Sequence, residues 1–293
     1  MIAFVILHYL ATDMTKKCVE EISALPGEKH IVIVDNASPN ESGKVLEEAY
    51  VSNDGITVIL NHENAGFARG NNLGVKWVLE NLDADFVVVL NNDVGIAQKD
   101  FIEKIGEIYK EHPFDVLGPD ILSVFSGIHQ NPKSLHGCNL EAIRKKRAGV
   151  KRTKNPILLL LSSGEKNSPA IWKQFQRRKR AKQHIDTSIK AEGVVLHGSC
   201  VIFSARYLEK HPEPFYPKTY MYYEMEILDW ICRKEKSVVL YDPSISVKHY
   251  QYMASKQKNR SIIKRSMFVI DCLLDSLDAA EELILQTEGE GVE

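Results

Sequence analysis

Five consecutive apolar residues are followed by three polar ones in the segment Phe86-Val87-Val88-Val89-Leu90-Asn91-Asn92-Asp93. A continuous valine-rich run is typical of a strand that is covered on both faces, as in a parallel sheet flanked by helices. In such sheets ligands bind outside the carboxyl ends of the strands, which is where the three polar residues stand. The segment therefore predicts an α/β fold with a site that begins at Asn91.

Short apolar runs alternate with helical patterns along most of the chain. In the first third we expect strands at 2–7, 31–34, 56–60 and 86–90, and helices at 12–25, 42–50 and 68–82. Later we expect strands at 193–196, 201–203, 238–241 and 245–247, and helices at 224–235 and 260–286. This alternation predicts a Rossmann-type, mainly parallel sheet with right-handed crossovers.

Basic residues dominate the stretch 139–190, which interrupts the alternation. Its clusters are 144–147 and 177–180, and the apolar segment 157–161 lies between them. We interpret the stretch as a basic insertion. The expected organisation is then an α/β half at 1–138, the insertion at 139–190, a second half of the same domain at 191–255, and a C-terminal helical extension with an acidic tail at 256–293.

Length and composition exclude several classes of protein. The 293 residues, 44% of them hydrophobic, suffice for a large core, and a formal net charge of −2 argues against a protein that coats nucleic acid. Five widely spaced cysteines without a C-x-x-C pair suggest neither a disulfide framework nor a zinc site. Because no stretch approaches the roughly 20 apolar residues of a membrane span, we expect a cytoplasmic protein, or one peripheral on the cytoplasmic face of the membrane.

Polar residues follow four of the expected strands, at His8-Tyr9, Asp35-Asn36, 61–64 and 91–93. Asp, Asn and Ser are also ordinary turn and N-cap residues, so each group alone is weak evidence. Together they favour one site, because the carboxyl ends of parallel strands share an edge of the sheet. A carboxylate at Asp35 is placed to accept hydrogen bonds from a base or from ribose hydroxyls.

The segment 64–72 opens the third expected helix. Gly66 and Gly70 allow close approach of the backbone to a ligand, and Arg69 offers charge to a phosphate. The glycine spacing is that of neither a Walker loop nor a dinucleotide fingerprint. Asp93 offers another way to hold a diphosphate, because a hard cation on its carboxylate keeps positions open for phosphate oxygens.

These motifs together resemble the inverting family 2 glycosyltransferases of the GT-A fold, bacterial enzymes that build surface polysaccharides such as capsules. The resemblance rests on residues 34–38, 64–72, 91–93, 197–203 and 219–228, and it covers about 1–132 and 193–250. It implies a GT-A-like fold and transfer of a sugar, with inversion, from a nucleotide-diphosphate sugar. It also implies a saccharide or lipid-linked oligosaccharide acceptor, with contact to the inner surface of the membrane.

The resemblance assigns a donor and metal site. It implies that Asp93 stands in the metal-binding D-x-D motif, where Asn91 replaces the first Asp, and that the cofactor is Mn²⁺ or Mg²⁺. His249 matches a further metal or diphosphate ligand and suits manganese better than magnesium; a structural, hydrogen-bonded role is the alternative. The residues expected at the nucleotide-sugar are His8, Tyr9, Asp35, Asn36, Asn64, Gly66, Phe67, Arg69, Asn71, Asn72 and Asn92.

A catalytic base is expected in the segment 223–226. An inverting displacement needs one carboxylate to take the proton of the acceptor hydroxyl. The family's acidic pair corresponds here to Glu224-Met225, with a further acid at Glu226. Residues two apart on a helix point in different directions, so one of the two glutamates faces the sugar. We favour Glu224, with Glu226 as the alternative.

The acceptor side is expected at His197, Gly198 and Ser199, with Tyr222 suited to stacking on a sugar ring. A tight turn that needs glycine is the alternative for Gly198. A plain core position is the alternative for Tyr222.

Two other functions are weighed against this one. A sugar-nucleotide-forming nucleotidyltransferase would carry a Gly-rich loop with Arg and Lys after its first strand, where this chain has residues 8–12. The basic insertion suits nucleic acid or an anionic membrane surface, but the chain has no recognised nucleic-acid motif, so we expect no nucleic-acid partner. The final helix is compatible with intramolecular packing or with a homo-oligomer contact.

Overall fold

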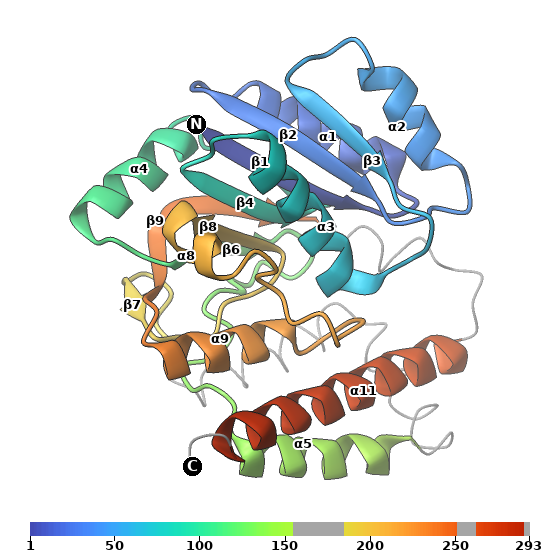
Figure 1. The fold of residues 1–293 in the computed structure, drawn as a ribbon, viewed down its shortest axis with the longest axis vertical. Helices are drawn as coiled ribbons and strands as arrows, with labels where there is room; N and C mark the ends of the chain where they lie inside the picture. The colour runs from blue at the N-terminus through green and yellow to red at the C-terminus, as the bar shows by residue number, and fades with distance from the viewer. Residues whose placement is uncertain (155–184, 251–261, 290–293) are drawn as a thin grey trace.

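A nine-stranded sheet forms the centre of the molecule, in a computed structural model that describes residues 1–154, 185–250 and 262–289 (Figure 1). The strands are β1 (Ile2–His8), β2 (Lys29–Asp35), β3 (Ile56–Leu60), β4 (Phe86–Asn91), β5 (Val94–Gly95), β6 (Val116–Ser123), β7 (Ala191–Glu192), β8 (Cys200–Ser204) and β9 (Val239–His249). The helices are α1 (Thr12–Ser23), α2 (Ser42–Tyr50), α3 (Gly66–Asn81), α4 (Phe101–Glu111), α5 (Leu140–Thr153), α8 (Ala205–Lys210), α9 (Glu224–Glu235) and α11 (Ile262–Gly289). The strand order is β3-β2-β1-β4-β8-β6-β9-β5, and β7 pairs with β9.

The first third of the chain forms the parallel part of this sheet. β1 pairs in parallel with β2 and β4, and β2 pairs in parallel with β3. The register sets His8 opposite Asp35 and Leu7 opposite Asn91, so the polar residues that follow these strands lie at one edge, as the sequence predicted. The second part is mixed, because β8 runs antiparallel to β4 and β6 while β9 runs parallel to β6.

Three clusters of buried apolar side chains pack the helices against the sheet and against one another. One face of the sheet packs on α1, α2 and α4, and the other face packs on α3, α8 and α9. A third, smaller cluster joins α9 to α5 and α11. In Figure 1, α5 and α11 lie side by side below α9. α5 and α11 therefore share an apolar core with α9, the helix that carries Glu224.

Two expected strand assignments differ from the structure, and the described residues also form β5, β6, β7, α4, α5 and α8, which were not expected from the sequence. Residues 193–196 form one isolated bridge, from Val195 to Ser134, so the strand predicted there is wrong. Val194, Val195 and Leu196 are buried by packing, and burial alone accounts for their apolar character. The two strands predicted at 238–241 and 245–247 are one strand, β9, which shifts register beyond Pro119 of β6.

The first basic cluster is largely paired within the protein. Its helix, α5, lies against α11 through the ion pairs Arg144–Glu281, Arg147–Asp278 and Lys154–Asp271, with N···O distances of 2.6, 2.7 and 2.8 Å. These ion pairs join the first helix of the expected insertion to the C-terminal helix. The apolar segment 157–161 and the cluster 177–180 lie outside the described residues.

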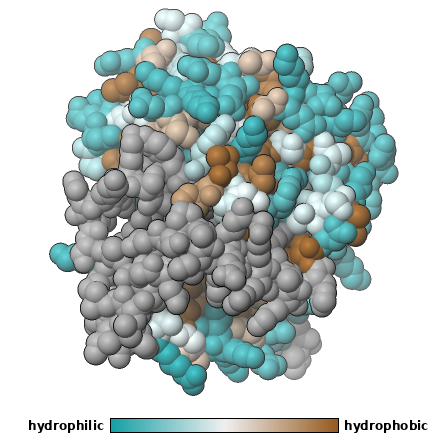
Figure 2. All heavy atoms as spheres, turned by 180° about the vertical axis from the view of Figure 1, so that it is seen from behind, coloured by the Kyte–Doolittle hydropathy of each residue, from teal (hydrophilic) through white to brown (hydrophobic). Residues whose placement is uncertain are grey.

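On the face seen in Figure 2, hydrophobic residues outside the grey atoms form small groups among hydrophilic ones. None of the helices in the described ranges is long and apolar enough to cross a membrane.

The start of α3 is joined to the loop before α9. Gly66 has a φ of +76°, and the N–H of Phe67 donates to the carbonyl of Tyr220 at 2.7 Å. A Cβ at Gly66 would lie 2.1 Å from that carbonyl oxygen. Glycine is required here, because the backbone is left-handed and the space for a side chain is filled.

We expect Gly66→Ala to lower the free energy of unfolding by more than about 1–2 kcal/mol, the usual cost of left-handed backbone in an L-residue. Gly106→Ala in α4 is the control, because a Cβ there meets nothing within 4 Å and alanine stabilises a helix interior by about 1 kcal/mol. Urea unfolding at pH 7 measures both changes. Equal stability of Gly66→Ala and the parent chain would contradict the structure at this junction.

Candidate active site

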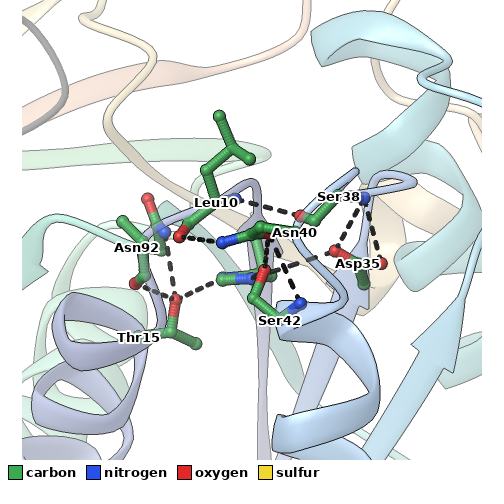
Figure 3. Close-up of polar contacts among 9 residues, drawn as sticks. Leu10, Thr15, Asp35, Ser38, Asn40, Ser42 and Asn92 are labelled. Carbon is green, nitrogen blue, oxygen red and sulfur yellow. Dashed lines mark hydrogen bonds and ion pairs between the residues drawn. The ribbon is translucent and has the colours of Figure 1, made fainter. Parts of the chain in front are cut away.

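His8 is the centre of a buried hydrogen-bond network at the end of β1, and its partners Thr15 and Ser42 are labelled in Figure 3. Its Nδ1 lies 2.6 Å from Thr15 Oγ1 and its Nε2 lies 2.8 Å from Ser42 Oγ. Asn92 Nδ2 donates to the same Thr15 oxygen at 3.0 Å. Burial lowers the pKa of His8 to about 4, against the opposing effect of Asp35, so the ring is neutral at pH 7. His8 thus holds α1 and α2 together, with both ring nitrogens used within the protein.

Asp35 ends β2 with its carboxylate beside the first turn of α2. Its Oδ1 and Oδ2 accept from the N–H of Ser38 at 3.3 and 3.2 Å (Figure 3). A Cβ at Gly43 would lie 2.3 Å from Oδ2, so glycine lets the start of α2 approach the carboxylate. The positive end of the helix dipole stabilises negative charge at this position. The neighbouring Tyr9 is half-buried at the same edge.

Asn36 fixes the loop that leads into α3. Its Nδ2 donates to Asn64 Oδ1 and to the carbonyl of Gly66, both at 3.0 Å. These bonds fix the conformation of residues 64–66, which are part of the segment expected to bind the nucleotide-sugar. Arg69 is exposed on the first turn of α3, with its guanidinium 3.9 Å from the Glu63 carboxylate.

Two neighbouring asparagines of α3 also bind backbone groups. Asn72 Nδ2 donates to the carbonyl of Phe215 at 2.7 Å, and its Oδ1 accepts from the N–H of Phe215 at 3.1 Å. Asn71 Nδ2 donates to the carbonyl of Phe67 at 2.9 Å, while its buried Oδ1 has no hydrogen-bond partner among the described residues. Among the asparagines expected to bind the nucleotide-sugar, Asn71 therefore keeps one side-chain oxygen that accepts no hydrogen bond among the described residues.

Asp93 and His249 face each other at the ends of β4 and β9. Asp93 Oδ1 lies 3.3 Å from His249 Nε2, and both side chains are about 10% exposed or less. His249 Nδ1 lies 2.8 Å from Gln130 Oε1, an oxygen that can only accept, so Nδ1 carries a proton. In the tautomer that has its one proton on Nδ1, Nε2 and the Asp93 carboxylate are two acceptors that face each other, and they fit a shared cation.

This pair fits a divalent metal in its chemistry. A carboxylate oxygen and an imidazole nitrogen suit Mn²⁺, and the bond to Gln130 orients the imidazole as an outer-shell partner does. No group of three or more His, Cys, Asp or Glu side chains that could hold a metal occurs in the described ranges. Asn91 of the expected motif is half-buried, and its N–H donates to the carbonyl of Ser199 at 3.0 Å.

The expected acceptor-side residues connect this pair to α9. The ring of His197 lies 5.8 Å from the ring of His249, and its Nδ1 lies 3.0 Å from Ser199 Oγ. A Cβ at Gly198 would lie 3.2 Å from Met225. The turn at Gly198 therefore brings the Asp93–His249 side of the edge close to the start of α9.

Glu224 begins α9 directly after a left-handed turn. Tyr222 and Tyr223 have φ values of 74° and 73°, which L-residues rarely adopt. Glu224 is 6% exposed, and its buried Oε1 has no hydrogen-bond partner among the described residues. Burial raises the pKa of Glu224 to about 7; Lys133 opposes the rise and Glu226 adds to it. A carboxyl group with a pKa near 7 suits a general base at neutral pH.

Glu226 lies in a different environment. Its Oε2 lies 2.8 Å from Lys133 Nζ, and its Oε1 lies 3.6 Å from Lys146 Nζ. Burial raises the pKa of this carboxyl group, but the two lysines outweigh burial and hold it below the usual range. A carboxylate that two cations keep ionised is a poor proton acceptor, so the geometry favours Glu224 over Glu226.

Several partners of these residues were not anticipated from the sequence. They are Thr15, Ser42, Gln130, Lys133 and Lys146. Gln130 and Lys133 act on residues 119 and 93 positions away, so no local pattern marks them. Lys146 belongs to the basic cluster, but its sequence neighbours gave no sign that it reaches α9.

Comparison with known proteins places the chain among sugar transferases. Residues 3–211 match the family described as glycosyl transferase family 2. The low-salt glycan biosynthesis hexosyltransferase Agl10 of Haloferax volcanii is 30% identical over 122 residues. That match spans 42% of this chain and 37% of the length of Agl10.

Two solved proteins share the fold at low sequence identity. Crystalline S. aureus TarS 1–349 aligns with a TM-score of 0.53 and 11% identity over 97% of this chain and 70% of TarS 1–349. GalNAc-T7, crystallised with UDP, GalNAc and Mn²⁺, aligns with a TM-score of 0.55 and 11% identity over 92% of this chain and 47% of its own. These likenesses show the fold, and the α/β class expected from the sequence is confirmed.

The raised pKa of Glu224 predicts a pH-dependent stability. The folded state binds this proton more tightly than the unfolded chain, so the free energy of unfolding falls as pH rises from 4.5 to about 7. We expect Glu224→Gln to be more stable than the parent above pH 7 by about 3 kcal/mol, at about 1.4 kcal/mol per unit. Urea unfolding from pH 4 to 8 measures the difference.

Glu226→Gln is the matched control and changes stability in the opposite direction. The lowered pKa of Glu226 stabilises the folded state at neutral pH, and this stabilisation is lost as pH falls. The Glu226→Gln chain should therefore be less stable than the parent at pH 8. A Glu224→Gln chain that is also less stable at pH 8 would rule out a Glu224 carboxyl group whose pKa is raised by burial.

Proposed function

The chain belongs to glycosyl transferase family 2, and from that membership we propose that it moves a sugar from a nucleotide-diphosphate sugar to a saccharide acceptor with inversion at the anomeric carbon. The match over residues 3–211 carries the class of reaction. The burial of Glu224 without a partner for Oε1 carries the mechanism. The acceptors we propose include lipid-linked oligosaccharides of cell-surface polysaccharide synthesis, by likeness to a hexosyltransferase of glycan biosynthesis.

The proposed reaction is one displacement. The Glu224 carboxylate takes the proton of the acceptor hydroxyl, and the hydroxyl oxygen attacks the anomeric carbon from the face opposite the leaving group. The bond from that carbon to the diphosphate oxygen breaks, and its electron pair leaves with the nucleoside diphosphate. One base is sufficient for such a step, which agrees with the ion pairing of Glu226 to Lys133.

The leaving diphosphate requires stabilisation of its charge. We propose that Asp93 and His249 hold a divalent metal, which supplies that stabilisation when bound. Arg69 offers a second positive charge at the same edge, from the first turn of α3. Structures of relatives in fold that contain UDP with Mn²⁺, or UDP, support a UDP-sugar as the first donor to test.

We expect Glu224→Gln to lower turnover about 10²- to 10⁴-fold, the usual contribution of a general base. Glu226→Gln should keep about a tenth of wild-type turnover or more, equivalent to about 1.4 kcal/mol in the barrier. The assay is release of nucleoside diphosphate from a panel of UDP-, GDP- and dTDP-sugars with Mn²⁺ and a panel of saccharide acceptors. The wild-type rate should fall as the pH drops below about 7.

The same assay can contradict the proposal in two ways. Near-normal turnover of Glu224→Gln would exclude Glu224 as the base. Release of pyrophosphate from a nucleoside triphosphate and a sugar phosphate, without release of nucleoside diphosphate from any donor, would indicate a nucleotidyltransferase.

We expect Asp93→Ala to abolish Mn²⁺-dependent turnover and to leave the fold intact by circular dichroism. The reason is that the variant leaves His249 without its carboxylate partner at 3.3 Å. Asp120→Ala is the control, because it removes another Asp–His contact, 2.8 Å to His129, on β6. Mn²⁺ titration by calorimetry in the presence of UDP gives a second measurement. Unchanged Mn²⁺-dependent turnover in Asp93→Ala would exclude Asp93 as a metal ligand. Turnover that is equal with and without Mn²⁺ in the wild-type chain would show a metal-independent enzyme on this scaffold.

A further inference from the structure

Lys146 of α5 contacts the turn that precedes the catalytic helix. Its Nζ lies 4.3 Å from the centroid of the Tyr223 ring, and 3.6 Å from Oε1 of Glu226. A cation over an aromatic face is attracted by the electrons of the ring. One side chain of the expected insertion therefore touches the residues on both sides of Glu224–Met225.

The turn itself needs support from its surroundings. Two successive non-glycine residues, Tyr222 and Tyr223, are left-handed, and such strain persists where the surrounding structure fixes it. Tyr223 is 5% exposed, in the apolar cluster shared by α5, α9 and α11. On the other side of the turn, Ser276 Oγ of α11 donates to the carbonyl of Met221 at 3.1 Å. The turn is thus held from α5 and from α11.

The two supporting helices are themselves tied to each other. Arg144 and Arg147 of α5 both contact Glu281 of α11, and Arg147 also contacts Asp278 at 2.7 Å. The position of Lys146, between these two arginines in sequence, is therefore fixed relative to α11. α5 and α11 form one support beneath the start of α9.

We propose that Lys146 is a positioning residue for glycosyl transfer: through Tyr223 and Glu226 it holds the turn that points Glu224 into the site. The inference rests on the proposed role of Glu224 as base. It assigns the insertion helix to the catalytic unit of the enzyme. The charged and titratable groups around Glu224 and Glu226 are Lys133, Lys146, Asp229, Tyr223, Cys138 and Cys272.

The test compares Lys146→Met, Lys146→Arg and Lys145→Met in the full chain. Methionine keeps the apolar stem but removes the charge, arginine keeps a cation, and Lys145 is the exposed neighbour on the same helix. For Lys146→Met we expect kcat with the active UDP-sugar to fall about tenfold, and KM to change by less than about twofold. The acidic limb of its pH profile should move to higher pH, because loss of a cation favours protonation of Glu224.

Lys146→Arg should restore kcat to within about threefold of wild type and return the pH profile to its original position. Lys145→Met should match wild type in both respects. A Lys146→Met enzyme with kcat within about twofold of wild type and an unmoved acidic limb would overturn the proposal.

A second readout uses no substrate. The difference in unfolding free energy between a chain and its Glu224→Gln derivative, followed against pH, reports the titration of Glu224 in that chain. We expect the midpoint to lie at higher pH in the Lys146→Met background and to stay unchanged in the Lys145→Met background. An unmoved midpoint would show that Lys146 does not influence Glu224 and would overturn the proposal. Turnover retained by Glu224→Gln would instead show that the proposed base is wrong, while this midpoint still reports the influence of Lys146 on Glu224.

Discussion

A buried polar atom needs a partner inside the protein, and this requirement separates the residues at the carboxyl edge of the sheet into two groups. His8, Asn36 and Asn72 use their polar atoms to bind other parts of the chain. Glu224 Oε1 has no hydrogen-bond partner in the described part of the chain, and Asp93 Oδ1 faces Nε2 of His249. The first group builds the edge, and the proposed function rests on the second group.

The division between these two groups of residues explains how much of the site the sequence predicts. Strand ends are readable because valine-rich runs stop at polar residues, and parallel register then places His8, Asp35 and Asn91 at one edge. What each polar side chain does at that edge is not readable. From the sequence, Asn72 is predicted to bind the nucleotide-sugar. In the structure its side chain forms hydrogen bonds with the backbone of Phe215, 143 residues away. Such pairings depend on how the two halves pack, which sequence spacing does not encode.

The choice between Glu224 and Glu226 as the base also depends on contacts that the sequence does not predict. The sequence places Glu224 and Glu226 on one helix and predicts that they point in different directions. Their difference in chemistry comes from lysines on other elements, Lys133 after β6 and Lys146 on α5. Identical side chains two residues apart thus have pKa values that shift in opposite directions. Environment, which only the fold supplies, separates a proton acceptor from an ion-pair partner.

The basic cluster of α5 has partners that composition does not reveal. A run of like charges with few acids is typical of a solvated segment, because unpaired charges repel one another and favour water. Here the compensating acids, Asp278 and Glu281, lie more than 130 residues later in α11. Pairing them closes α5 onto the C-terminal helix and carries Lys146 to the start of α9. α5 and α11 therefore both support the turn that precedes α9, since Tyr223 lies in the apolar cluster that the three helices share.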